Sequence, residues 1–175
     1  ENINKFKTGD RVVSNGNHAE YVLCPTNLCA KIPHNVSDKE AAFTVIASIA
    51  LQGIRLVDPS IGENIVVFGL GIIGLIAVQI LKANGCNVLA FDFDAKKIKL
   101  AREFGAEAYD LKTYDAVTIA QNFSNNLGVD GVVVCTNTNS NQVMSDSALM
   151  SRKRGRIILV GVTGLKLSRN DFYEK

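Results

Sequence analysis

The sequence predicts an α/β fold in which helices cover both faces of a parallel sheet. Short apolar runs alternate with segments of helical character between residues 64 and 162, and this alternation is typical of βαβ units. The runs 65–68 and 157–160 are apolar at every position, as expected of strands that are buried on both sides. Right-handed crossovers between five such strands give the sheet order 3-2-1-4-5, with strands numbered along the chain.

The alternating segments define the expected elements. Strands are expected at 64–69, 87–91, 107–110, 129–135 and 156–162, and helices at 72–84, 95–104, 114–125 and 141–151. An earlier helix is expected to begin after Ser37, which forms a capping box with Glu40, and to run to about Leu51 or Leu56. The basic run 152–154 is interpreted as a solvated helix end, where positive charge suits the helix dipole.

Residues 1–33 differ from the rest of the chain because they contain only short strand and turn signals. Strands are expected at 11–13, 19–24 and 28–32. Three short strands are too few to form a stable sheet with its own core. We therefore expect residues 1–33 to be the end of a larger β-rich unit, followed by a second domain at residues 34–175.

The segment Gly69-Leu70-Gly71-Ile72-Ile73-Gly74 follows the first strand of the expected sheet and opens the next helix. This context predicts the phosphate-binding turn of a Rossmann dinucleotide-binding domain. Gly69 permits the tight turn, Gly71 lets the pyrophosphate approach the backbone, and Gly74 lets the helix lie close to the strand. The first helical turn, which includes Ile72 and Ile73, offers free N–H groups to the phosphates.

Asp92 lies at the end of the second strand, 18 residues after Gly74. A carboxylate there can accept hydrogen bonds from the adenosine ribose and would repel a 2′-phosphate, so NAD is favoured over NADP. Asp94 is close enough to be a rival, and the basic Lys96 and Lys97 leave NADP open. Residues near the carboxyl ends of strands are expected to line the cofactor site, because ligands collect at that edge; they are Phe93, Lys97, Thr136, Val160, Gly161 and Val162.

Composition and charge exclude several classes of protein. The 175 residues are 47% hydrophobic and 21% charged, which suits a domain with a real core. The net charge of +2 gives no electrostatic footprint for nucleic acid or an anionic membrane, and no apolar run is long enough to span a membrane. Residues 1–5 lack a signal-peptide pattern and the four cysteines form no Cys-x-x-Cys pair, so reduced thiols and a cytoplasmic location are expected.

Other polar or sulfur side chains are weaker candidates for a functional role. Cys24 and Cys29 could form a metal-binding pair, but no histidine or second pair completes it, so buried thiols are favoured. Cys135 ends the fourth strand without a partner base that would make it a catalytic thiol. His18 and His34 lie in or near turns and are interpreted as surface histidines rather than as an acid or a base.

The glycine motif and several other segments together resemble the medium-chain dehydrogenase/reductase superfamily, the alcohol dehydrogenase-like proteins. Their order and spacing carry the resemblance: Gly9-Asp10-Arg11-Val12, Ala19-Glu20-Tyr21-Val22, Lys31-Ile32-Pro33, Glu40-Ala41-Ala42, Gly105-Ala106, Gly128-Val129-Asp130 and Gly155-Arg156-Ile157-Ile158-Leu159-Val160-Gly161. The resemblance implies that residues 1–33 close a GroES-like substrate domain, whose early part supplies most catalytic groups and is expected to be missing. It also implies a homo-oligomer of the full-length protein and an inactive chain when this segment stands alone.

The same resemblance bears on zinc and on catalysis. Zinc-dependent relatives carry a cysteine ligand where this chain has Thr44, and threonine is a poor zinc ligand, so no zinc is expected. Ser48 falls where relatives have a hydroxyl residue near the nicotinamide, and either a proton relay or a core serine fits this position. The closing segment 168–175 resembles the bi-domain bacterial oxidoreductases, in which a dehydrogenase of this kind is fused to a sugar-oxidoreductase-like half.

The sequence thus predicts an NAD(P)-dependent oxidoreductase, or its cofactor-binding portion. The expected reaction transfers hydride between the nicotinamide and a small-molecule alcohol, carbonyl or sugar-type substrate. Two other interpretations stay open: a regulatory module that senses NAD without turning it over, and an S-adenosylmethionine-dependent methyltransferase. The methyltransferase also uses a Gly-rich turn and an acid after the second strand, but the third glycine of the motif counts against it.

Overall fold

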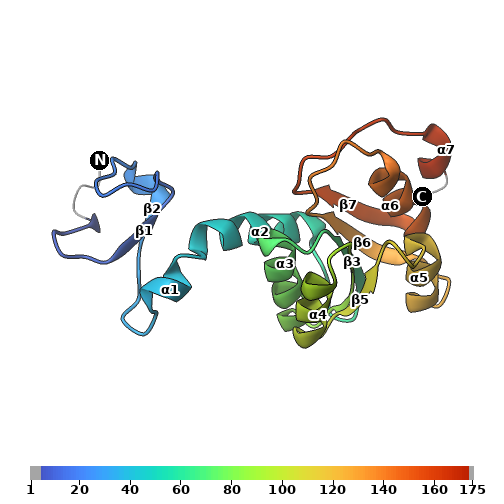
Figure 1. The fold of residues 1–175 in the computed structure, drawn as a ribbon, viewed down its shortest axis with the longest axis horizontal. Coiled ribbons are helices and arrows are strands. Elements are labelled where there is room, and N and C mark those ends of the chain that lie inside the picture. Colours follow the sequence, from blue (N-terminus) through green and yellow to red (C-terminus); the bar gives the residue numbers. More distant parts are fainter. Residues whose placement is uncertain (1–4, 174–175) are drawn as a thin grey trace. The chain divides into compact units, whose positions relative to one another are not determined.

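The computed structural model describes residues 5–173 of the chain. The chain divides into two compact units, Glu1–Ser48 and Ile49–Lys175, each of which is described by itself (Figure 1). Residues 1–4 of the N-terminal segment lie outside the described residues, as do residues 174–175 at the end of the segment that resembles the bi-domain oxidoreductases. Within residues 5–173, no helix is long and apolar enough to cross a membrane.

The first unit contains a two-stranded antiparallel sheet and a short helix. Strand β1 (Val12–Ser14) pairs with strand β2 (Cys29–Lys31), which follows the 3-10 helix η2 (Thr26–Leu28). Helix α1 (Asp38–Ala41) begins after Ser37 with the predicted capping box. The backbone N–H of Glu40 donates to the Ser37 hydroxyl, and the Ser37 N–H donates to the Glu40 carboxylate at 2.8 Å.

Two expectations for this part of the chain are wrong. Residues 19–24 form bends and loop rather than a strand, because the sheet of this unit consists of β1 and β2 and offers them no pairing neighbour within the described residues. The helix expected from Ser37 to Leu51 or Leu56 is two helices, α1 and α2 (Thr44–Val57). The break follows a bond from the N–H of Phe43 to the carbonyl of Glu40, a 3-10 spacing that tightens the end of α1.

The second unit contains a five-stranded parallel sheet whose order confirms the prediction. Its strands are β3 (Asn64–Phe68), β4 (Asn87–Asp92), β5 (Glu107–Asp110), β6 (Val129–Val134) and β7 (Ser151–Leu159). The neighbours follow the order β5-β4-β3-β6-β7, which is 3-2-1-4-5 when this sheet alone is numbered. Strand β3 is central, because Val66 pairs with Leu89 on one side and with Val132 on the other.

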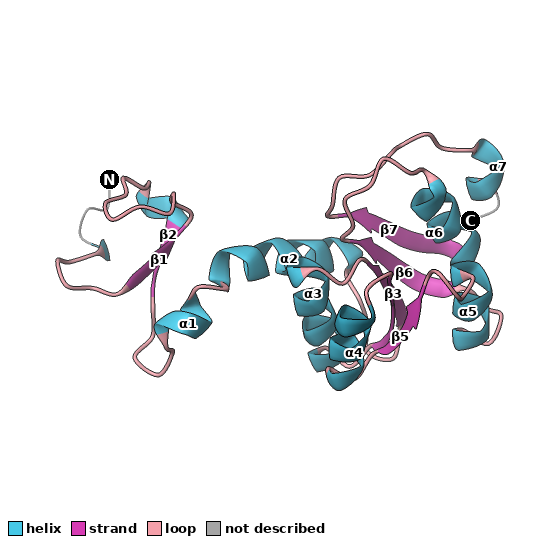
Figure 2. Ribbon diagram, viewed as in Figure 1, coloured by secondary structure: helices cyan, strands magenta, loops and turns pink. Residues whose placement is uncertain are grey.

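Helices cover both faces of this sheet. Side chains along a strand alternate between the two faces, and those of β3 pack in two separate clusters. Ile65 and Val67 pack in one buried cluster with α2 and with α3 (Ile72–Ala83) and α4 (Ala95–Glu103). Val66 and Phe68 pack in a second cluster with α5 (Ala116–Phe123) and the end of α6 (Gln142–Met150). Figure 2 shows the two helical layers, with α3 and α4 on one side of the sheet and α5 and α6 on the other. The short helix α7 (Arg169–Phe172) follows the sheet.

The basic run 152–154 lies in β7 and not at a helix end, which corrects the interpretation of the sequence. Helix α6 ends at Met150, and the next residue, Ser151, is already extended and pairs with Val129. A bulge follows, and Arg154 has a positive φ of 61° within it. Within the run, Arg152 has anionic partners at the start of the sheet, and these favour a strand over a solvated helix end.

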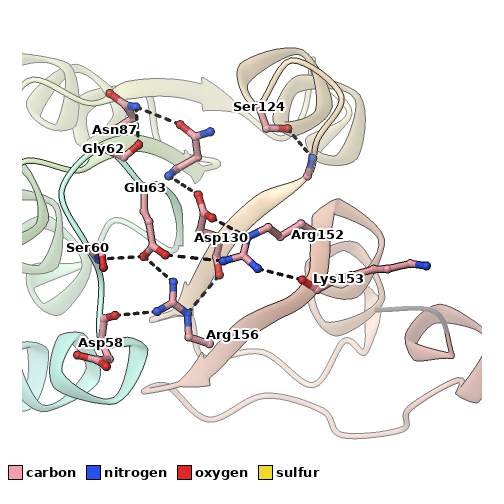
Figure 3. Close-up of polar contacts among 12 residues, drawn as sticks. Asp58, Ser60, Gly62, Glu63, Asn87, Ser124, Asp130, Arg152, Lys153 and Arg156 are labelled. Atoms are coloured by element: carbon pink, nitrogen blue, oxygen red, sulfur yellow. Dashed lines mark hydrogen bonds and ion pairs between the residues drawn. The ribbon is translucent and has the colours of Figure 1, made fainter.

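Those partners form an ion-pair network at the amino-terminal edge of the sheet (Figure 3). Arg152 Nε lies 2.6 Å from Asp130 Oδ1, and Arg156 Nη2 lies 2.5 Å from Glu63 Oε2. Asp130 also accepts a hydrogen bond at 2.8 Å from the backbone N–H of Asn64. The network therefore joins the beginnings of β3 and β6 to β7.

Candidate functional site

The turn after β3 brings the three motif glycines together at the carboxyl edge of the sheet. Gly69 has a φ of +85°, a left-handed conformation that favours glycine. A Cβ on Gly74 would lie 1.9 Å from the carbonyl oxygen of Gly69, so only glycine lets α3 start this close to the turn. A Cβ on Gly71 would meet no atom within 4 Å, so the space in front of this residue is open.

Helix α3 begins in that open space without a capping side chain. Gly71 is its N-cap, and among residues 5–173 no side-chain cap hydrogen bond is made there. Such groups, which belong here to Ile72, Ile73 and Gly74, carry the positive end of the helix dipole. The arrangement can therefore hold an anionic group such as a pyrophosphate.

Asp92 is tied directly to the glycine turn. Its Oδ2 accepts a hydrogen bond at 2.7 Å from the N–H of Leu70, and its Oδ1 accepts from the N–H groups of Phe93 and Asp94 at 2.8 and 2.9 Å. These three bonds fix the carboxylate at the end of β4. A carboxylate has about four acceptor positions, so roughly one remains for a hydroxyl from a ligand.

The neighbouring charged residues have different partners. Lys97 Nζ lies 3.9 Å from Asp92 Oδ1. Asp94, the rival candidate, caps α4 by accepting a bond at 2.8 Å from the N–H of Lys96, and this bond holds the pKa of Asp94 below its usual range. Asp92 is therefore the acid that is joined to the phosphate-binding turn, whereas Asp94 is committed to a helix.

Two cavities open around Asp92. One has a volume of about 460 Å³ and includes Gly71, Asp94, Lys97 and Cys135 in its wall. The other has a volume of about 410 Å³ and extends to α5 and α6. Four residues line both cavities, namely Gly69, Asp92, Phe93 and Thr136. The structure thus brings six predicted residues together around adjoining cavities: these four with Gly71 and Lys97.

The wall of the cavity of about 410 Å³ includes several residues that the sequence did not indicate. They come from the segments that follow β5 and β6, from the start of α5 and from the first two turns of α6: Leu111, Tyr114, Asp115, Ala116, Thr138, Ser140, Gln142, Val143 and Asp146. The rule that ligands collect after parallel strands could have indicated Thr138 and Ser140. It could not have indicated Asp146, which lies inside a helix.

Other predicted residues lie outside the walls of these two cavities. Val160, Gly161 and Val162 follow β7. Gly161 packs so closely on the segment after β6 that a Cβ would lie 2.0 Å from the carbonyl oxygen of Thr136. Ser48 belongs to the first unit, and its hydroxyl donates to the carbonyl of Val45 at 2.6 Å.

The cysteines and histidines form no metal centre within the described residues, where no group of three His, Cys, Asp or Glu side chains is close enough to hold an ion. Burial raises the pKa of the Cys135 thiol to about 12, so this thiol is neutral at physiological pH. His18 and His34 are exposed. None of these groups has the setting of an activated nucleophile or base.

Comparison with known proteins places the second unit among dehydrogenases. The model of the family described as zinc-binding dehydrogenase matches residues 73–173. An alcohol dehydrogenase from Geobacillus stearothermophilus is 32% identical over 149 residues, which are 84% of this chain and 43% of the relative. The chain spans less than half the length of the curated relatives it matches.

Solved structures of dehydrogenases are also similar to this chain. The alcohol dehydrogenase from Thermus sp. ATN1 has a TM-score of 0.74 at 26% identity, with 81% of this chain and 44% of the other covered. A protein from Sinorhizobium meliloti 1021, described as a zinc-binding dehydrogenase and solved with NADP bound, has a TM-score of 0.78 at 27% identity, with 88% and 47% covered.

Proposed function

The chain belongs to the zinc-binding dehydrogenase family of the medium-chain dehydrogenase/reductase superfamily, and from this premise we propose that it binds a nicotinamide adenine dinucleotide at the carboxyl edge of its sheet. The whole protein is then an oxidoreductase of the alcohol dehydrogenase kind. Its substrate is a small alcohol, carbonyl compound or sugar.

The hydrogen bond from the N–H of Leu70 to Asp92 Oδ2 carries this proposal. It joins the glycine turn, with open space before Gly71, to a carboxylate that keeps acceptor capacity. An anion-binding helix start and a hydroxyl acceptor thus stand side by side, as the pyrophosphate and the adenosine ribose of a dinucleotide require. The adjoining cavity of about 410 Å³ provides room for the base.

Within this proposal the favoured cofactor is NAD. Asp92, Asp115 and Asp146 line the cavity of about 410 Å³, and no lysine or arginine of the described residues is in its wall. A 2′-phosphate at the ribose would meet the charge of Asp92. Lys97 opposes this preference, but its ammonium group lies beside Asp92, which neutralises part of its charge. The relative from Sinorhizobium meliloti 1021 was solved with NADP bound, so NADPH belongs in the test of this preference.

The residues of this chain hold and orient the cofactor rather than supply an acid or a base. When bound, the nicotinamide ring gives or takes a hydride. The first turn of α3 holds the phosphates, Asp92 fixes the ribose, and the closely packed Gly161 and Thr136 border the edge of the sheet. We infer that acid–base groups and any zinc ligands belong to other parts of the whole protein, and that this chain alone does not turn over substrate.

Titration of the 175-residue chain with NADH, followed by nicotinamide fluorescence, tests the proposal. We expect saturable binding, and we expect Asp92→Asn to weaken NADH binding by about 10-fold or more while improving the relative affinity for NADPH. Asp110→Asn is the matched control, because Asp110 pairs with Asp92 at the end of the next strand and is not a lining residue of either cavity.

Three outcomes would contradict the proposal. The first is no saturable NADH signal from a chain that is folded by circular dichroism. The second is saturable binding of S-adenosylmethionine instead, which would favour the methyltransferase interpretation. The third is an equal loss of affinity in the Asp92 and Asp110 variants, which would remove the special role of Asp92. Binding without turnover in the whole protein would support a sensing role over catalysis.

A further inference from the structure

The cavity of about 410 Å³ changes in character from one end to the other. Asp92 and Gly69 form the end next to the glycine turn. Apolar side chains such as Leu111 and Val143 line the cavity, as suits a flat heterocycle. Asp146, from the second turn of α6, also belongs to the wall. A nucleoside whose ribose contacts Asp92 would therefore extend its base along apolar walls towards α6.

The carboxylate of Asp146 has an unusual setting. The side-chain amide of Gln142 donates to its Oδ1 at 2.8 Å, which leaves Oδ2 outside that bond. No lysine or arginine of residues 5–173 forms an ion pair with it. Burial raises its pKa, and the negative charge of Asp115 adds to that effect. A carboxylate with neither a cation nor full solvation lowers the stability of the fold.

The other two acids of the cavity have defined partners. Asp92 accepts three backbone hydrogen bonds, and Asp115 caps α5 by accepting a bond at 2.8 Å from the N–H of Thr118. Among the described residues, Asp146 accepts a bond only from Gln142, and it neither caps a helix nor forms an ion pair. Asp146 thus lowers the stability of the fold and lies in the wall of a binding cavity. A contact with the ligand explains this combination.

We infer that Asp146 selects the base of the dinucleotide, by accepting a hydrogen bond from the exocyclic amine of adenine. Hypoxanthine carries a carbonyl oxygen at the same position, and that oxygen would face the carboxylate without a donor between them. Gln142 holds the carboxylate in place for this contact. Asp146 is thus a specificity-determining residue, and this inference rests on the proposed binding of a nicotinamide dinucleotide.

The test compares NADH with reduced nicotinamide hypoxanthine dinucleotide, which differs from NADH only in the base. In a fluorescence titration of the 175-residue chain, NADH should bind at least about 10-fold more tightly than the hypoxanthine dinucleotide. In Asp146→Asn, the amide can donate to the hypoxanthine oxygen as well as accept from adenine, so the ratio of the two dissociation constants should fall towards one. Asp110→Asn is the matched control, because Asp110 is an acid of the same unit that lines neither cavity, so the ratio should stay at its wild-type value.

The readout is a ratio of affinities, so a modest change in stability does not affect it. Equal binding of the two dinucleotides by the wild-type chain would overturn the inference and leave the proposed function intact. An unchanged ratio in Asp146→Asn, or an equal change in Asp110→Asn, would also overturn it. Failure of both dinucleotides to bind would overturn the proposed function and this inference with it.

Discussion

Gly74→Ala should destabilise the second unit, whereas Gly71→Ala should leave its stability nearly unchanged. The added Cβ at position 74 would lie 1.9 Å from the carbonyl oxygen of Gly69, which is a backbone atom. That carbonyl cannot move freely, because the N–H of Gly69 bonds to the carbonyl of Phe91 at 2.9 Å. Overpacking of this kind costs about 1–3 kcal/mol, and the rigid backbone neighbour places the cost near the upper end, about 3 kcal/mol.

Differential scanning calorimetry measures this difference. For a chain of this size each kcal/mol shifts the Tm by about 2–4 °C, so Gly74→Ala should lower it by roughly 6–12 °C. Gly71 has a φ of −66° and open space around its Cβ position, so Gly71→Ala should shift the Tm by about 2 °C or less. The larger Gly71→Val should still fold and should lose NADH binding. Equal Tm values for the two alanine variants would refute the packing argument.

Three further predictions concern other parts of the second unit. Arg156→Met should lower stability by about 1–3 kcal/mol in chemical denaturation, because it leaves the carboxylate of Glu63 without its closest partner; Lys153→Met, an exposed control in the same strand, should have almost no effect. Alkylation with iodoacetamide at pH 8 should leave Cys135 unlabelled in peptide mapping, because with a pKa of about 12 only about 10⁻⁴ of it is thiolate. Asp146→Asn should raise the Tm at pH 7, because the pKa of Asp146 is raised and its charged form destabilises the fold; the gain should shrink as the pH falls through that raised pKa and vanish below the ordinary value of 3.8.

Each of these has a result that would contradict it. Equal stability losses in Arg156→Met and Lys153→Met would mean that the ion-pair network contributes nothing specific. Labelling of Cys135 in the folded chain as fast as in urea would show that it is not buried. A Tm gain for Asp146→Asn that persists unchanged at pH 3 would mean that packing, and not charge, causes it.

The sheet could be predicted because its signals are local. Continuous apolar runs such as 65–68 reveal strands buried on both faces, and Gly69 and Gly85 mark the turns between elements. The errors arose where partners lie far apart in the sequence. The run 152–154 has the composition of a helix end, and only the distant Glu63 and Asp130 explain why it is a strand.

In the candidate site, too, residues with a local signal could be predicted and residues placed by tertiary packing could not. Asp92 could be found from its spacing to the glycine motif, because both lie in one βαβ unit. Asp146 could not, because its position in the cavity depends on how α6 packs against the sheet, which no local pattern records. The assignments of Val160, Gly161, Val162 and Ser48 as site residues stay predictions.

The bond between Leu70 and Asp92 also bears on how fast a dinucleotide can bind. It joins Asp92, the proposed ribose acceptor, to the turn before α3 in the absence of any ligand. Little conformational entropy is then left to lose on association, and no slow rearrangement has to precede it. AMP, which carries a phosphate and the adenosine ribose, would meet the same preformed surface. Its phosphate and its ribose would bind together, so each contact would strengthen the other.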